Sequence, residues 1–187
     1  MVFLLQQMML YAVPLMIVAL AGVCAERSGV INLALEGIMI FGAFMGVVFV
    51  RMFQGAGWTQ SQGQLIMIIS LLLSGICGIL FSMLLAFSAI NLKADQTIGG
   101  TALNMLAPAI VMFFIYMIVQ QNTMGMAEGG AAGWFMIKPQ TFGYPKGYSF
   151  GAIGDFFLNK VYLSTYICIL IFIIISVDRK STRLNSS

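Results

Sequence analysis

Five long stretches of apolar residues alternate with shorter polar segments along the chain. A helix needs about 20 predominantly apolar residues to cross the hydrocarbon core of a bilayer, and most of the stretches approach that length without a charged side chain. The second stretch is less regular, because its uncharged part covers only residues 37–50 and reaches spanning length by including residues 31–36. The pattern predicts five transmembrane helices. They cover residues 1–25, 31–50, 65–90, 101–119 and 161–177.

The composition agrees with a membrane protein. Of the 187 residues, 60% are hydrophobic and only 8% are charged, whereas about 25% of the residues of an ordinary soluble domain are charged. This balance excludes a soluble enzyme and a disordered tail, and the net charge of +3 is too small and too scattered for a nucleic-acid-binding patch. We therefore expect an all-α, polytopic integral membrane helical bundle that lies in the lipid bilayer and binds no nucleic acid.

Several kinds of chemistry are missing from the sequence. The chain has no histidine, so it has neither a Ser-His-Asp or Cys-His nucleophile nor a histidine metal site. Its three cysteines lie far apart inside apolar stretches, a spacing that fits no zinc or redox motif. No segment matches the phosphate-binding pattern G-x-x-x-x-G-K-S/T. We expect no catalytic residue, metal or cofactor, and if ATP drives the protein, another chain must hydrolyse it.

Two segments outside the spans differ from simple connections. The loop of residues 120–160 is too long for a turn between helices, which predicts a function for it. Basic side chains follow the fifth span closely and favour a cytoplasmic C-terminal side, which places this loop outside the cell. The tail, residues 179–187, breaks abruptly with the apolar chain and reads like a translated cloning scar. We therefore expect one transmembrane domain in residues 1–178 and a non-native tail after it.

Small residues are spaced for close packing between helices. Within lipid, helices associate where small side chains let their backbones approach, and residues four apart lie on one helix face. The third span carries such a row, and the second span carries a G-x-x-x-G pair. We expect these residues to form a helix–helix seam. They are Ser70, Ser74, Gly78 and Ser82 on the third span, with Gly42 and Gly46 on the second.

Two polar segments, residues 26–37 and 93–104, interrupt the apolar pattern. Each begins with charged, long polar and hydroxyl side chains, continues with glycine and ends with a polar residue inside an apolar run, which leaves open a faint internal repeat. The residues at the starts are expected to cap helices and to anchor the topology rather than to bind a solute. This helix-end group consists of Glu26, Arg27, Ser28, Asp95, Gln96 and Thr97.

Three polar residues inside apolar runs are candidates for a solute path: Glu36, Asn32 and Asn104. An unpaired polar group in hydrocarbon costs several kcal/mol, so we expect all three side chains to point into the protein interior. A carboxylate inside a span is especially costly and marks either a path or a structural pair. For Glu36 both interpretations stay open: a path or gating group, or an ion pair with Arg27 or Lys93 at the membrane end.

The two polar segments resemble a known family. AERSGVINLALEGIMIFGAF is similar to the signature near the N-terminus of bacterial ABC transporter permeases of the nucleoside and simple-sugar type, within the branched-chain amino acid/ribose-type permease superfamily. ADQTIGGTALNMLAP is similar to the second signature of these permeases, and the order and separation agree. The resemblance covers residues 1–178 and the N-terminal half of the family only, which implies an incomplete permease domain.

The resemblance implies a function and a set of partners. The chain would be a multi-pass permease subunit of an ATP-binding-cassette importer in the bacterial plasma (inner) membrane, forming part of the translocation path for nucleosides or simple sugars. Its partners would be a second permease subunit, ATP-binding cassette subunits and an extracytoplasmic substrate-binding lipoprotein. The alternative is a self-sufficient secondary transporter or channel. That alternative calls for several intramembrane acids or histidines, and the chain offers Glu36 alone. A non-transport membrane scaffold is a third possibility, against which the two polar segments argue.

Overall fold

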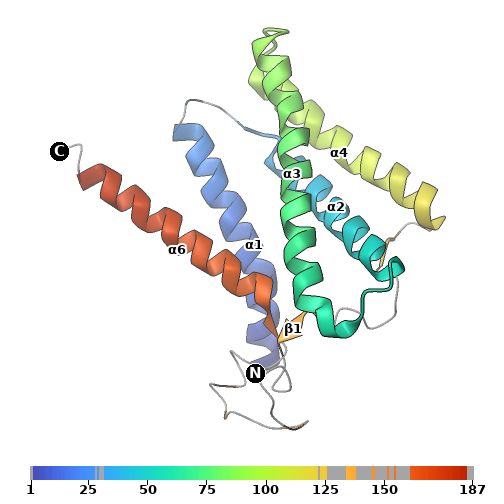
Figure 1. Cartoon of the computed structure of the whole chain (residues 1–187). Coiled ribbons are helices and arrows are strands. Elements are labelled where there is room, and N and C mark those ends of the chain that lie inside the picture. Colours follow the sequence, from blue (N-terminus) through green and yellow to red (C-terminus); the bar gives the residue numbers. More distant parts are fainter. Residues whose placement is uncertain are drawn as a thin grey trace. The chain divides into compact units, whose positions relative to one another are not determined.

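The computed structural model describes residues 2–27, 29, 32–121, 123–125, 134–137, 145, 151, 154 and 161–184, and most of them are helical (Figure 1). The helices are α1 (Val2–Arg27), α2 (Leu35–Gly55), the short 3-10 helix η1 (Gln60–Gln62), α3 (Gly63–Ile90), α4 (Gln96–Val119) and α6 (Leu163–Leu184). Two two-residue strands, β1 (Met136–Ile137) and β2 (Val161–Tyr162), complete the described elements. The predicted all-α, polytopic helical class is confirmed.

Four helices, α1 to α4, are long and apolar enough to cross a membrane. The second span, whose apolar stretch was the least regular of the five in the sequence, is a continuous helix of 21 residues. It continues through Arg51 because a long basic side chain near a helix end can extend its charge towards the interface. The fifth span is the short one, since the apolar part of α6 covers only Leu163–Val177. The helical segment continues beyond it, to Leu184.

The chain divides into two compact units, residues 1–21 together with 135–187, and residues 22–134. The first unit contains most of α1, the strand pair and α6. Its strands pair antiparallel, with Met136 opposite Tyr162 and Ile137 opposite Val161. The sequence predicted helix from residue 161, and the structure corrects this, because residues 161 and 162 pair with β1 before α6 begins.

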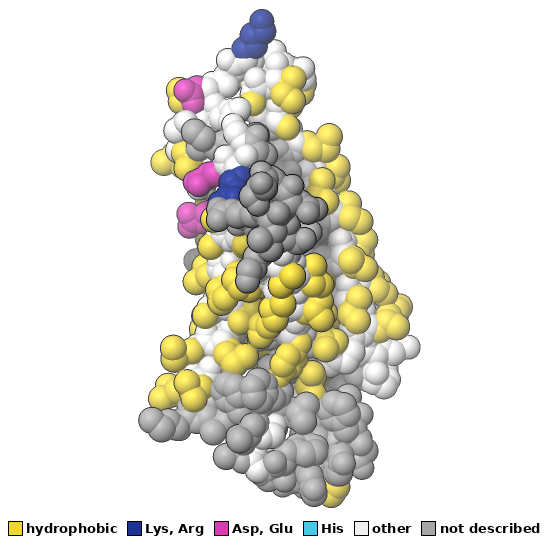
Figure 2. Space-filling model, turned by 90° about the vertical axis from the view of Figure 1, so that its left-hand side faces the viewer, with side chains coloured by type: hydrophobic (Ala, Val, Ile, Leu, Met, Phe, Trp, Pro, Cys, Tyr) yellow, Lys and Arg dark blue, Asp and Glu magenta, His cyan; other side chains and the backbone are white. Residues whose placement is uncertain are grey.

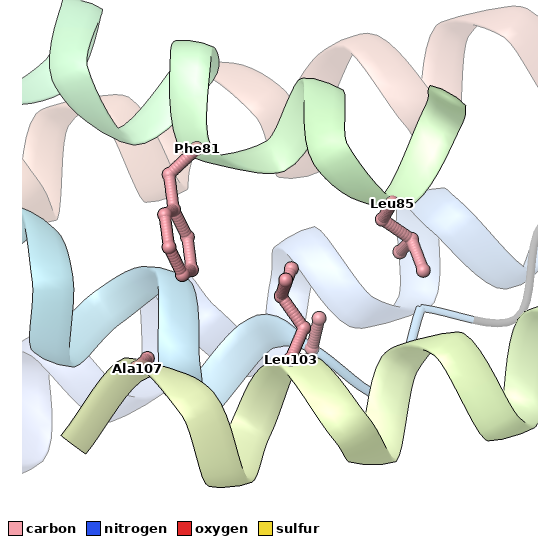
Figure 3. Close-up of a cluster of buried hydrophobic side chains, with 5 residues drawn as sticks. Phe81, Leu85, Leu103 and Ala107 are labelled. Atoms are coloured by element: carbon pink, nitrogen blue, oxygen red, sulfur yellow. The ribbon is translucent and has the colours of Figure 1, made fainter. Parts of the chain in front are cut away.

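The second unit is built around α2, which packs against both α3 and α4. Its hydrophobic core joins all three helices, as Phe81 and Leu85 from α3 approach Leu103 and Ala107 from α4 (Figure 3). Ala34, at the N-terminal end of α2, completes the buried cluster. Stacking of the Phe41 and Phe81 rings, 4.4 Å apart between centroids, continues this core along α2 and α3. Aromatic pairs of this kind add about 0.5–1.5 kcal/mol beyond the burial of their surface.

Four small residues of the predicted seam, Gly42, Gly46, Ser74 and Gly78, lie between α2 and α3. A Cβ atom added to Gly46 would lie 3.7 Å from Cβ of Ser74, and one added to Gly42 would lie 4.0 Å from the carbonyl oxygen of Ser74. One turn further along α3, a Cβ on Gly78 would lie 3.8 Å from Cγ2 of Ile38. Ser70 and Gly78 are buried, and Ser74 and Ser82 are half-buried. The hydroxyls of Ser74 and Ser82 donate to carbonyls of their own helix, so the seam depends on close packing.

The surface has the pattern of a membrane protein. On the face shown in Figure 2, hydrophobic side chains cover much of the described surface, and the acidic and basic side chains gather towards one end. Large apolar side chains on α3 and α4 are widely exposed, including Leu72, Ile79, Met105 and Phe113. Side chains of this size are normally buried in a water-soluble domain, so their exposure here fits helices that face lipid or other membrane segments.

Candidate functional site

The N-terminal turn of α2 is where the polar residues singled out in the sequence meet. The first hydrogen bond inside this helix runs from the N–H of Ile38 to the carbonyl oxygen of Ala34, at 2.9 Å. The N–H groups before Ile38 therefore have no acceptor within the helix. Ser, Thr, Asp or Asn normally caps such donors, but the N-cap residue here is Ala34, which provides no side-chain cap. The turn needs acceptors from elsewhere.

Two asparagine side chains provide those acceptors. Oδ1 of Asn32 accepts from the N–H of Ala34 at 3.1 Å, two residues along the chain. Oδ1 of Asn104, on α4, accepts from the N–H of Gly37 at 2.6 Å across 67 residues of sequence. The first bond is local, whereas the second joins two helices. Both residues were candidates for the solute path, and both use the amide oxygen to cap the same helix end.

The backbones of the two segments also approach closely at this point. A Cβ atom added to Gly37 would lie 3.0 Å from the carbonyl oxygen of Leu103 and 3.1 Å from Cβ of Ala107. A Cβ added to Gly100 would lie 3.0 Å from Cβ of Leu33 and 3.3 Å from its backbone nitrogen. Glycine is required wherever two backbones come this near. The two polar segments of the sequence thus form one contact between the start of α2 and the first half of α4.

Glu36 lies on the same turn, but its side chain is exposed in this chain. Neighbouring residues are about 100° apart around a helix, and because Gly37 faces α4, Glu36 is turned away from that contact. Within this chain Asn32 and Asn104 are half-buried, whereas Glu36 is exposed. Within the described part of the chain, neither Arg27 nor Lys93 forms an ion pair with Glu36.

The helix-end group gives a helix cap at Asp95. Oδ1 of this residue accepts from the N–H of Thr97 at 2.7 Å, which caps α4. Hydrogen bonding from the backbone N–H of Thr97, and next from its side chain, holds the pKa of the Asp95 carboxyl below its ordinary value. Gln96 and Thr97 form the first turn of α4. The other members lie at the C-terminal end of α1, where Glu26 and Arg27 are exposed and Ser28 falls outside the described residues.

Two contacts at the other end of the second unit were not predicted. Nη1 of Arg51, near the C-terminal end of α2, donates to the carbonyl oxygen of Gly125 at 3.1 Å. A Cβ on Gly63, at the start of α3, would lie 2.7 Å from the carbonyl oxygen of Trp134. Gly125 and Trp134, both within the 120–160 loop, therefore touch the ends of α2 and α3. In the sequence, only a single arginine after an apolar run and a glycine before the next one signal these contacts.

Metal-binding chemistry is not evident in the described part of the chain. No group of three or more His, Cys, Asp or Glu side chains there is placed to hold a metal ion. Cys24, Cys77 and Cys168 are free thiols in three different helices. We therefore take the polar contact between α2 and α4 as the candidate functional site.

Comparison with known proteins assigns the family. The model of the family described as "Branched-chain amino acid transport system / permease component" matches residues 4–178. The chain belongs to this family. The resemblance drawn from the two polar segments is thereby confirmed, and with four helices of spanning length the chain is a multi-pass membrane protein. No solved structure matches the chain.

Proteins with similar sequences include ABC transporter permease proteins. The chain is 46% identical over 110 residues to the guanosine ABC transporter permease protein NupQ of Bacillus subtilis, which covers 59% of this chain and 33% of the relative. It is 37% identical over 121 residues to the nucleoside ABC transporter permease protein NupC of Lactococcus lactis, covering 65% of this chain and 37% of the relative. It is 31% identical over 117 residues to the putative glucose ABC transporter permease protein TsgC13 of Haloferax volcanii, covering 63% and 32%. The matched part spans about a third of each relative.

Proposed function

We propose that residues 1–178 form part of the permease subunit of an ATP-binding-cassette importer for nucleosides in the bacterial inner membrane. The observation that supports this most is the similarity to permeases of guanosine and nucleoside transporters, at 46% and 37% identity. Simple sugars are the second candidate class, because a relative at 31% identity is a putative glucose permease. Hydrolysis of ATP is assigned to separate ATP-binding cassette subunits. A second permease subunit and an extracytoplasmic substrate-binding lipoprotein complete the proposed complex.

Within this function, we place the solute path beside the N-terminal turn of α2. Glu36 is the proposed path residue because its exposed carboxylate lies on a turn otherwise formed by half-buried and buried groups. Its negative charge is also favourable at a helix N-terminus, where the helix dipole is positive. Asn32 and Asn104 belong to the same site through the hydrogen bonds that cap the turn. A carboxylate accepts hydrogen bonds from the hydroxyl and N–H groups that nucleosides carry.

Uptake measurements with two matched glutamate variants test the proposal. Family-length permease containing residues 1–178 is expressed with its partner subunits, and uptake of tritiated guanosine is measured for Glu36→Gln and for Glu26→Gln. Both residues are exposed glutamates in the second unit. Loss of a charged hydrogen bond costs about 1.5–3 kcal/mol, so we expect Glu36→Gln to lower uptake at least about tenfold. Glu26→Gln, at the end of α1, should leave uptake close to the wild-type rate.

Two results would count against this proposal. Normal guanosine uptake by Glu36→Gln, in a complex that assembles, would remove Glu36 from the path. Competition separates the solute classes: unlabelled nucleosides should suppress the uptake of tritiated guanosine, and unlabelled glucose should not. Uptake of tritiated glucose by a complex that takes up no tritiated guanosine would favour the sugar class.

A further inference from the structure

We propose that Asn104 is a positioning residue: from α4, its amide oxygen holds the N-terminal turn of α2 and thereby fixes Glu36 beside the solute path. The proposal rests on the proposed function insofar as Glu36 lines that path. The sequence made Asn104 a candidate for the solute path, and the proposal gives it a supporting role beside that path. The hydrogen bond between Oδ1 of Asn104 and the N–H of Gly37, at 2.6 Å, is its basis.

The turn depends on this bond because its own sequence caps it poorly. Ala34 has no side chain that accepts a hydrogen bond, and Asn32 satisfies only the N–H of Ala34. Gly37 is the last residue before the intrahelical hydrogen bonds begin, since the N–H of Ile38 already donates to Ala34. An N–H group left without an acceptor away from water is costly. Within the described chain, Asn104 gives the N–H of Gly37 its acceptor.

The chemistry of Gly37 fixes which end of the amide faces it. A backbone N–H only donates, so the atom of Asn104 that faces it must be the oxygen, and the amide nitrogen points elsewhere. Asp at this position keeps an oxygen of the same reach, whereas Leu has a similar size and no acceptor. The two substitutions therefore separate the hydrogen bond from the volume of the side chain.

The surrounding backbone allows little adjustment. A Cβ on Gly37 would lie 3.0 Å from both Oδ1 of Asn104 and the carbonyl oxygen of Leu103, and Gly100 touches the backbone before α2. Gly37 packs against the backbone of α4, and Gly100 packs against the backbone before α2. These two contacts fix the distance between the start of α2 and the first half of α4. Glu36 directly precedes Gly37, so a turn that loosens at Gly37 also changes where the carboxylate lies.

The first measurement tests the hydrogen bond without reference to transport. Amide hydrogen exchange is followed over residues 32–40 in family-length permease carrying Asn104→Leu, Asn104→Asp or the matched control Asn91→Leu. Asn91 is an exposed asparagine at the end of α3 in the same unit. We expect exchange at Gly37 to accelerate about tenfold or more in Asn104→Leu, and to stay near wild type in Asn104→Asp and Asn91→Leu. Unchanged exchange in Asn104→Leu would overturn the proposal.

The second measurement asks whether the bond acts through Glu36. Uptake of tritiated guanosine is compared for Asn104→Leu, Glu36→Gln and the double variant. If Asn104 acts by positioning Glu36, each single variant loses about tenfold, Asn104→Asp recovers most of the uptake, and the double variant loses little more than Glu36→Gln alone. Additive losses would mean a purely structural role and would overturn the proposal, as would normal uptake by a variant whose Gly37 exchanges freely.

The two measurements distinguish failure of this inference from failure of the proposed function. If Glu36→Gln transports normally, the path assignment fails, and the positioning role fails with it even where the exchange result still shows the hydrogen bond. If Glu36→Gln is impaired but exchange at Gly37 is insensitive to Asn104, only the positioning role fails. Where Asn104→Leu does not assemble, Asn104→Ala serves in its place, because it removes the acceptor oxygen without adding volume. Exchange and uptake are then read by the same criteria.

Discussion

Replacing Gly78 by leucine is the sharpest test of the packing between α2 and α3. Gly78 is buried, and a Cβ atom there would lie 3.8 Å from Cγ2 of Ile38, an ordinary contact distance. Alanine therefore fits and should be tolerated. Leucine adds three further carbon atoms beyond the Cβ, in a place where Ile38 already fills the space.

The expected magnitude follows from two opposing effects. Glycine inside a helix is about 0.5–1 kcal/mol less favourable than alanine, so any substitution gains a little from helix propensity. Overpacking a filled site costs about 1–3 kcal/mol. We expect Gly78→Ala to be neutral or stabilising by up to about 1 kcal/mol and Gly78→Leu to destabilise by about 1–2 kcal/mol.

Gly75 provides a matched control on the same helix. It is exposed, and a Cβ atom added there meets nothing within 4 Å. Gly75→Leu should therefore keep only the gain in helix propensity. The assay is the midpoint of thermal unfolding in detergent, together with recovery of the assembled complex. If Gly78→Leu is as stable as Gly75→Leu, α2 and α3 do not pack closely at Gly78, and the prediction is wrong.

Two further predictions concern a helix end and the topology. Asp95→Asn should lower stability only where the carboxylate is ionised: because the pKa of Asp95 is held below its ordinary value of 3.8, its contribution is fully present above that pH and disappears as the pH falls through the lowered pKa. Unfolding midpoints of wild type and variant should therefore converge below that pKa, and a difference that grows with acidity would contradict the cap. Thr141→Cys, in the part of the 120–160 loop outside the described residues, should react with an impermeant thiol reagent in intact cells. Reaction only after lysis would reverse the topology.

The helices could be predicted largely from hydropathy, because membrane-spanning helices need long apolar runs whatever their neighbours are. Their ends could not. The uncharged part of the second stretch ends before Arg51, yet α2 continues to Gly55. Within this last part of the helix, Arg51 donates a hydrogen bond to the carbonyl oxygen of Gly125. Nothing in the local sequence of α2 specifies that partner, since it lies 74 residues away.

The candidate site illustrates the same limit. Polarity alone identified Asn32, Glu36 and Asn104, and the structure brings all three to one helix turn. Polarity could not reveal the separate roles of these residues, because the N–H of Gly37 finds its acceptor only when α4 packs against α2. Ala34 at the N-cap, which has no side-chain acceptor, is a local signal that an outside acceptor is needed.

The central claim, that this chain is part of an importer driven by ATP, is tested most directly by transport in proteoliposomes. Family-length permease containing residues 1–178 is reconstituted with its ATP-binding cassette subunits and binding lipoprotein, and tritiated guanosine is supplied on the side of the lipoprotein. We expect accumulation that requires ATP on the opposite side and persists when ion gradients are collapsed. Accumulation without ATP, driven by a proton or sodium gradient, would contradict an ATP-driven importer and favour a self-sufficient secondary transporter.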